Sequence, residues 1–276
     1  MLFKTKLSML VLFSAFMAYL IVASQILWHE VLLLMIGGFM VTAASNILNQ
    51  VLERDFDKLM KRTADRPLAT GRMSISTGVM MAGFLALIGT TLLAVLNVWA
   101  ALLGMLSLVS YSFIYTPMKR VSPIAVWIGA IPGALPMAIG CVVAEGTLTP
   151  LAIALFGIQF FWQFPHFWAI GFLGFEDYKK AGFKFLPGVN GQRDEKTGLH
   201  SFIYAMLLVF VPFLFWWNGD ASIISVLAIA ITSLVYAKYG WNLYKENTDA
   251  AAKKLMFFSF AYMPIVLFVL MVEKFL

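Results

Sequence analysis

Oxygen-bearing side chains recur at every fourth position in NQVLERDFDKLMKRTADRP, residues 49–67, which directly follows a long apolar stretch. A helix turns about 100° per residue, so Asn49, Glu53 and Asp57 share one helix face. Amide and carboxylate oxygens suit a hard cation such as Mg²⁺, and the basic residues that flank them suit phosphate. At a membrane surface, this pattern predicts an enzyme site for a Mg²⁺-bound diphosphate whose apolar tail lies in the bilayer.

The polar face extends back into the apolar stretch. Asn46 and Asn49 lie inside it, where an amide without a partner costs about 1–3 kcal/mol, so we expect both to be hydrogen-bonded. Glu53 and Asp57 continue the same face toward water. The alternative is a helix end that carries solvated charges, but the polar face reaches too far into the apolar region for that interpretation.

The composition excludes a soluble protein. The chain is 61% hydrophobic and only 12% charged, with a mean hydropathy of +0.86. Its apolar stretches are long enough for helices that cross about 30 Å of hydrocarbon. We therefore predict one membrane domain, residues 1–276, without a separate soluble part. Nine spans are predicted, at about 7–27, 30–51, 76–97, 99–117, 123–144, 149–173, 198–217, 221–240 and 255–273.

The basic residues predict the orientation of these spans. Every Lys and Arg except Lys274 falls in alternate connections, which positive-inside topology places in the cytoplasm. The N-terminus is then cytoplasmic and the C-terminus is outside. The formal net charge of +6 reflects this topology and phosphate binding rather than nucleic acid. Without an Arg-rich and Ser-rich presequence, the chain is typical of a bacterial cytoplasmic membrane.

Residues 49–67 resemble the first Asp-rich motif, NxxxDxxxD, of the UbiA superfamily of intramembrane prenyltransferases, with Glu53 where Asp is commonest. The continuation M-x-R-T-x-x-R-P, residues 60–67, narrows the resemblance to the protoheme IX farnesyltransferases, or heme O synthases. The resemblance implies that Asn49, Glu53 and Asp57 hold Mg²⁺ and diphosphate. The basic residues that it implies as diphosphate ligands here are Arg54, Lys58, Arg62 and Arg66.

A second cluster is YSFIYTPMKRVSP, residues 111–123. Tyr111 and Tyr115 share a helix face, and Lys119 and Arg120 are expected at the cytoplasmic surface. By itself this pattern is equally typical of an interfacial anchor. The resemblance favours function, and implies that Tyr115, Lys119 and Arg120 bind diphosphate.

A third cluster, FFWQFPHFWAIGF, residues 160–172, contains His166, the only histidine expected inside the membrane. A lone histidine on an apolar helix is more often a packing residue than a ligand. The run W-Q-x-P-H-F nevertheless resembles the heme O synthases, and its aromatic rings suit a flat macrocycle. The resemblance implies heme binding by Trp162, Gln163 and His166, with His166 as an iron ligand or porphyrin-orienting group.

A fourth cluster, EDYKKAGFKFLPGVNG, residues 176–191, follows the sixth span. It resembles the family's second acidic loop most closely at Asp177, which we expect to be a further Mg²⁺ ligand. Lys180 is expected to contact diphosphate. The only other carboxylate near Asp177 is Glu176, so a second metal held wholly by protein is not favoured.

The predicted fold is an all-α polytopic membrane protein, with nine transmembrane helices around a central cavity that opens to the cytoplasmic side. The resemblance implies transfer of farnesyl from farnesyl diphosphate to a vinyl group of heme B, giving heme O and diphosphate. Mg²⁺ is then the cofactor, heme B is a substrate, and heme A synthase or terminal-oxidase assembly factors are candidate partners. Two alternatives stay open: a UbiA-type enzyme with another aromatic or tetrapyrrole acceptor, and a membrane transporter with an intramembrane polar path.

Overall fold

The structure is a computed structural model that describes residues 2–188 and 191–274, and the described residues are helical with short connections. Val189 and Asn190, part of the fourth sequence cluster, lie outside the described residues. The helices are α1 (Thr5–Val22), α2 (Trp28–Asp57), α3 (Ile75–Leu96), α4 (Val98–Val109), the π-helix η1 (Ser110–Tyr115), α5 (Thr116–Met118), α6 (Ala125–Glu145), α7 (Pro150–Leu173), α8 (Phe175–Lys180), α9 (Lys196–Phe210), α10 (Pro212–Trp217), α11 (Ile223–Glu246) and α12 (Asp249–Glu273).

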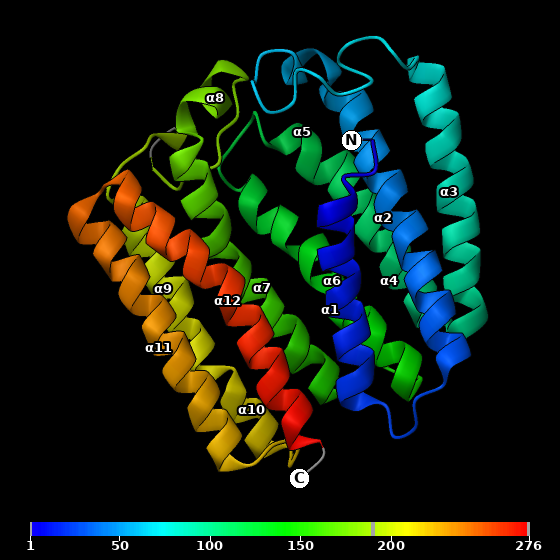
Figure 1. The fold of residues 1–276 in the computed structure, drawn as a ribbon, viewed down its shortest axis with the longest axis vertical. Coiled ribbons are helices and arrows are strands. Elements are labelled where there is room, and N and C mark those ends of the chain that lie inside the picture. Colours follow the sequence, from blue (N-terminus) through cyan, green and yellow to red (C-terminus); the bar gives the residue numbers. More distant parts are fainter. Residues whose placement is uncertain (1, 189–190, 275–276) are drawn as a thin grey trace.

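The prediction of an all-α polytopic membrane protein is confirmed. Within the described residues, eight helical segments are long and apolar enough to cross a membrane, with α4–α5 and α9–α10 each counted as one. The remaining predicted span, 149–173, corresponds to α7, a 24-residue helix that carries Gln159, Gln163 and His166. The long helices run side by side, and the termini lie at opposite ends of the bundle (Figure 1). The central cavity open to the cytoplasm stays a prediction.

Local chemistry determines where the helices begin and end. The side chain of Asn97 accepts from the backbone N–H of Trp99, so it caps α4 directly after α3 has ended. Thr149 caps α7 in the same way, through the N–H of Ala152. Gly146 ends α6 with a positive φ of 82°, which glycine adopts without strain. Short turns therefore separate α3 from α4 and α6 from α7, whereas longer connections follow α2 and α7.

Two apolar cores share the central helix α6. One core joins α6 to α1–α4, and the other joins it to α7, α9, α11 and α12. At Gly140 the backbone of α6 approaches α1 so closely that an added Cβ would lie 2.1 Å from the carbonyl oxygen of Ala15. The absence of a side chain at Gly140 therefore allows α6 to pack closely against α1.

The span that begins with α4 contains an irregular helical turn before it reaches the loop. Pro117 has no N–H to donate to the carbonyl one turn earlier, and the preceding turn, Ser110–Tyr115, is a π-helix. The hydroxyl of Thr116 donates instead to the carbonyl oxygen of Tyr111, at 2.8 Å. This irregular turn brings Thr116 and Lys119 to the polar face of α2.

Candidate active site

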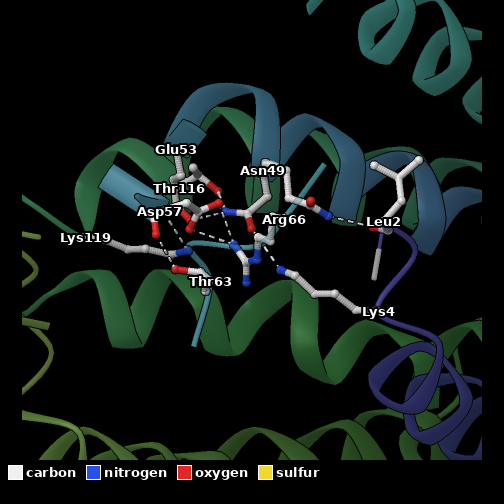
Figure 2. A network of polar contacts seen from close by, with 10 residues as sticks. Leu2, Lys4, Asn49, Glu53, Asp57, Thr63, Arg66, Thr116 and Lys119 are labelled. Carbon is white, nitrogen blue, oxygen red and sulfur yellow. Dashed lines mark hydrogen bonds and ion pairs between the residues drawn. The ribbon is translucent and has the colours of Figure 1, made fainter. Parts of the chain in front are cut away.

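The polar face of α2 is the centre of the site. α2 extends to Asp57, so Asn49, Glu53 and Asp57 lie on one helix face, as their spacing predicts (Figure 2). Their exposed fractions are 1%, 4% and 0%. The expectation that Glu53 and Asp57 continue toward water is wrong. The N-terminal segment, the loop after α2 and the end of the α4–α5 span cover them.

Each of these three side chains contacts its own cation. The pairs are Lys4 Nζ with Asn49 Oδ1 at 2.9 Å, Lys119 Nζ with Glu53 Oε1 at 2.9 Å, and Arg66 Nη1 with Asp57 Oδ1 and Oδ2 at 2.8 Å. The cations come from three different parts of the chain, which converge on α2 (Figure 2). Buried carboxylates need such partners, because an uncompensated buried charge costs several kcal/mol.

Further hydrogen bonds connect the pairs into one network. The Nδ2 group of Asn49 donates to Glu53 Oε2 at 2.9 Å and to Thr116 Oγ1 at 3.1 Å. The hydroxyl of Thr63 donates to the carbonyl oxygen of Asp57 at 2.9 Å, where α2 ends. The loop after α2 and the irregular turn before α5 are thus fixed to the same helix face.

Residues 2–4, which we call the N-terminal strap, lie against the deeper part of this face. Gln50 Nε2 donates to the carbonyl oxygen of Leu2 at 2.6 Å, and Asn46 Nδ2 donates to that of Phe3 at 3.2 Å. These bonds confirm that Asn46 has a partner inside the apolar region. They also place Lys4, which has a left-handed φ of 44°, next to Asn49.

Lys4 is the site residue that sequence reasoning missed. It precedes the first predicted span, where a basic residue is typical of positive-inside topology. Burial holds the pKa of the Lys4 ammonium group well below its usual value, and repulsion from Arg66 and Lys119 lowers it further. One signal in the sequence could have indicated Lys4. Asn46 and Asn49 lie in an apolar stretch near the membrane surface and need polar partners there.

The network has three cations against two carboxylates, which favours an added anion. Its oxygen donors are hard, as Mg²⁺ prefers, but the described residues hold no group of three His, Cys, Asp or Glu that could bind a metal by themselves. The donor set therefore fits a Mg²⁺ ion that arrives with further oxygen ligands. A diphosphate supplies those ligands and the missing negative charge.

Besides Lys180, four of the predicted diphosphate ligands do not join this network. Arg54 and Lys58 both pair with Asp55 on the exposed side of α2, because neighbouring residues on a helix point about 100° apart. The guanidinium group of Arg120 stacks on the Phe56 ring, 3.9 Å from its centroid. Arg62 is exposed on the loop after α2.

Lys119 and Tyr115 do lie at the site. Lys119 is buried, with 6% of its surface exposed, and it is bound to Glu53. Its Nζ lies 4.5 Å from the centroid of the Tyr115 ring, close enough for cation–π attraction. Tyr111 packs beside Tyr115, with ring centroids 5.4 Å apart, which agrees with a shared helix face.

The segment from α8 to residue 185 contacts the site, but its predicted ligands pair with each other. Asp177 is half-buried and lies 3.7 Å from Lys180, and no hydrogen bond or ion pair within the described residues joins either one to the α2 network. The backbone N–H of Lys184 donates to the carbonyl oxygen of Lys119 at 2.7 Å. Phe183 packs with Met60 in a small apolar cluster. Mg²⁺ binding by Asp177 stays a prediction.

His166 on α7 forms a second polar site, against α12. Its Nδ1 lies 2.7 Å from Ser259 Oγ, and the Ser259 hydroxyl donates to the carbonyl oxygen of Met256. A hydroxyl has one proton, so the proton of the first bond belongs to Nδ1 and His166 Nε2 carries the free lone pair. No hydrogen bond to Nε2 occurs within the described residues. In this tautomer Nε2 is the nitrogen that can bind a metal.

The structure separates the other two residues of this cluster. The Trp162 ring stacks on His166, with centroids 4.9 Å apart and planes at 17°, and its N–H donates to the carbonyl oxygen of Ser259. Gln163 points toward α6 instead, where its Nε2 donates to the carbonyl oxygen of Ala130 at 3.0 Å. The contacts of Gln163 are those of a residue that holds α7 against α6, and the prediction that it binds heme remains untested.

Comparison with known proteins identifies relatives over nearly the whole chain. The profile of the UbiA prenyltransferase family matches residues 11–261. The protoheme IX farnesyltransferase of Cytophaga hutchinsonii is 44% identical over 276 residues, which cover 98% of this chain and 95% of that protein.

Solved structures with the same fold are more distant in sequence. A digeranylgeranylglyceryl phosphate synthase structure has a TM-score of 0.82 at 22% identity, and the match covers 99% of this chain and 96% of that one. A UbiA homologue from Archaeoglobus fulgidus bound to GPP and Mg²⁺ has a TM-score of 0.70 at 17% identity, with 98% of each chain covered. At these identities the likeness shows the fold alone.

The Arg66–Asp57 pair should contribute strongly to stability. Arg66→Met leaves the Asp57 carboxylate buried without a counter-charge, so we expect the free energy of unfolding to fall by about 3–5 kcal/mol. Arg72→Met is the matched control, because Arg72 pairs with Asp65 at the surface and its loss should cost less than about 1 kcal/mol. Denaturant unfolding in detergent micelles measures both. Equal losses would contradict the burial of the pair.

Proposed function

Because this chain belongs to the UbiA prenyltransferase family and is a membrane-embedded prenyltransferase, we propose that it transfers farnesyl from farnesyl diphosphate to a vinyl group of heme B. The products are heme O and diphosphate. The observation that carries the proposal is the buried face of α2, where three oxygen-bearing side chains each contact a cation. The choice of heme B is supported by the name of the Cytophaga relative, which the chain matches over nearly its whole length.

Mg²⁺ fits the donor set of α2 together with diphosphate oxygens. Asn49, Glu53 and Asp57 would hold the ion, and when bound it supplies Lewis-acid charge that stabilises the diphosphate leaving group. The Archaeoglobus structure of the same fold contains GPP and Mg²⁺, which supports this assignment. Asp177 is a further ligand only if α8 turns its carboxylate toward α2, since it now faces Lys180.

The cations of the network have two successive roles. Without substrate, each cation contacts one of the side chains assigned to the metal. Arg66 neutralises Asp57, Lys119 neutralises Glu53, and Lys4 donates to Asn49. With diphosphate bound at this face, the three cations would donate to its phosphate oxygens instead. They then neutralise the charge that develops on the leaving group as the allylic C–O bond breaks, which is electrostatic stabilisation of the transition state.

The farnesyl cation left by this cleavage reacts with the π electrons of the heme vinyl group. A new C–C bond forms, the positive charge moves to the vinyl carbon next to the macrocycle, and one water adds there with loss of a proton. The site must exclude other water from the first cation. The α2 face is buried under the strap and the loop after α2, and the segment from α8 to residue 185 contacts the site. This burial supports the exclusion of water.

His166 is the proposed heme ligand. Its Nε2 lone pair is free because Nδ1 keeps its proton and donates a hydrogen bond to Ser259 Oγ, and the stacked Trp162 ring fixes the imidazole plane. A ligand so oriented would hold heme B by its iron while the vinyl group reacts. Trp162 then acts as a positioning residue, and its ring offers an apolar face beside the macrocycle.

The membrane placement follows from the distribution of charge. The strap, the loop after α2 and α8 lie at the end of the bundle that contains the N-terminus (Figure 1). The positive-inside pattern supports a cytoplasmic position for this end in a bacterial cytoplasmic membrane, with the C-terminus outside. Farnesyl diphosphate then reaches its site from the cytoplasm, and heme O is available to heme A synthase or terminal-oxidase assembly factors.

We expect purified protein to convert heme B and farnesyl diphosphate to a product heavier by one farnesyl group and one hydroxyl group, as measured by mass spectrometry. Chelation of divalent metal should abolish the product and added Mg²⁺ should restore it, because without the ion the carboxylates of α2 would repel the diphosphate. Product formation that is indifferent to chelation would contradict the metal assignment. Prenylation of a quinone precursor but not of heme would favour another aromatic acceptor.

The His166 assignment predicts a separation of two affinities. His166→Ala should weaken heme B binding by about tenfold or more and shift its visible absorption, with little change in farnesyl diphosphate binding. His200→Ala is the matched control, since His200 is a half-exposed histidine whose Nδ1 lies 2.8 Å from the carbonyl oxygen of Lys196. If His166→Ala leaves the heme spectrum and the heme affinity unchanged, the heme-ligand assignment is contradicted and His166 is a packing residue.

A further inference from the structure

An apolar groove lies on the outer surface between α9 and α11, away from the polar face of α2. Its volume is about 460 Å³, within the range of roughly 300–1,000 Å³ that is common for small-molecule sites. α11 ends at the same end of the bundle as the N-terminus (Figure 1). The residues that line the groove are Phe202, Met206, Leu234, Ala237, Lys238 and Trp241.

The groove is built on a rigid floor. The backbones of the two helices touch at Gly240, where an added Cβ would lie 2.7 Å from the backbone nitrogen of Phe202. Ala237 is 1% exposed and forms the floor beside this crossing. The Phe202 and Trp241 rings, with centroids 5.2 Å apart, form a wall. The shape of the groove therefore depends on helix packing rather than on mobile side chains.

One end of this apolar groove is positively charged. Lys238 lines it and is exposed, and Lys245 Nζ lies 5.3 Å from the centroid of the Trp241 ring. None of the ion pairs found between residues 2 and 274, leaving aside 189–190, involves Lys238 or Lys245. The two ammonium groups are thus available to an anion at the edge of the groove.

The position of the groove in the bilayer determines which anion fits. The predicted span ends near residue 240, so Lys238 and Trp241 lie at the depth of the lipid headgroups and Leu234 lies deeper. An ammonium group at this depth attracts a lipid phosphate, and an aromatic ring with a polar edge suits the glycerol region. The apolar part of the groove, between Met206 and Leu234, is then available to an acyl chain.

We propose that this groove binds an anionic phospholipid, with its phosphate at Lys238 and Lys245 and one acyl chain between α9 and α11. The inference is independent of the prenyl-transfer reaction and of the residues assigned to it. A second copy of the chain or another membrane protein fits less well, because it would cover Lys238 in an apolar contact without a counter-charge.

The test compares two lipids with identical acyl chains, a phosphatidylglycerol and a phosphatidylcholine, added at equal concentration to the full-length protein in detergent. Native mass spectrometry counts the retained adducts. We expect the parent protein to retain the anionic lipid about tenfold better. The double variant Lys238→Ala/Lys245→Ala should lose this preference. The control Lys253→Ala/Lys254→Ala, which removes two exposed lysines of α12, should keep it.

A second pair of variants tests the acyl-chain part of the groove. Leu234→Trp should fill the groove and reduce adducts of both lipids. Ile231→Trp places the same ring on an exposed part of α11 outside the groove and should leave them unchanged. Thermal unfolding of each variant in detergent verifies that it is folded. Retention of the preference by the lysine double variant, or a dimer that Leu234→Trp dissociates, would overturn the proposal.

Discussion

A carboxylate buried in a membrane protein is stable only with a counter-charge, and this constraint determines how the rest of the structure is arranged around α2. Glu53 and Asp57 are buried, so Lys119 and Arg66 must reach them. Lys119 can do so because the π-helical turn before Pro117 changes the register of its span. Arg66 can do so because the loop after α2 folds back, fixed by Thr63. The connections at one end of the bundle are therefore parts of the site.

The same pairs prepare the site for its substrate. Cations held next to metal-binding oxygens are already at the place where phosphate oxygens would lie, so little reorganisation is needed when the leaving group develops charge. The residues proposed to bind heme are also oriented before the substrate arrives, but by neutral groups. Ser259 and Trp162 fix the proton and the plane of His166, which leaves one nitrogen free. Both halves of the bundle thus present pre-oriented groups, held by helices that share the central α6 and α7.

The length of the apolar stretches was sufficient to predict the long helices. Helical periodicity was sufficient to predict the common face of Asn49, Glu53 and Asp57, because that face depends on positions within one helix. The partners of that face could not be found in this way. Lys4 and Lys119 look like topology signals in the sequence, and only tertiary packing brings them to α2. Arg54 and Lys58 are closer in sequence to the acidic residues, yet they point to Asp55 on the other side of the helix. Likewise, one shared motif does not reveal that Trp162 and Gln163 face different helices.

The most direct test of the α2 site is the affinity for a non-reactive thiolo analogue of farnesyl diphosphate, measured by calorimetry in Mg²⁺. Glu53→Gln removes a buried site carboxylate, and Asp55→Asn removes an exposed carboxylate two residues away on the same helix. The account predicts that Glu53→Gln weakens Mg²⁺-dependent binding by about 10- to 100-fold, the usual size of a lost metal-site contact, while Asp55→Asn binds like the parent. Equal affinities in all three proteins would contradict the assignment of diphosphate to this helix face.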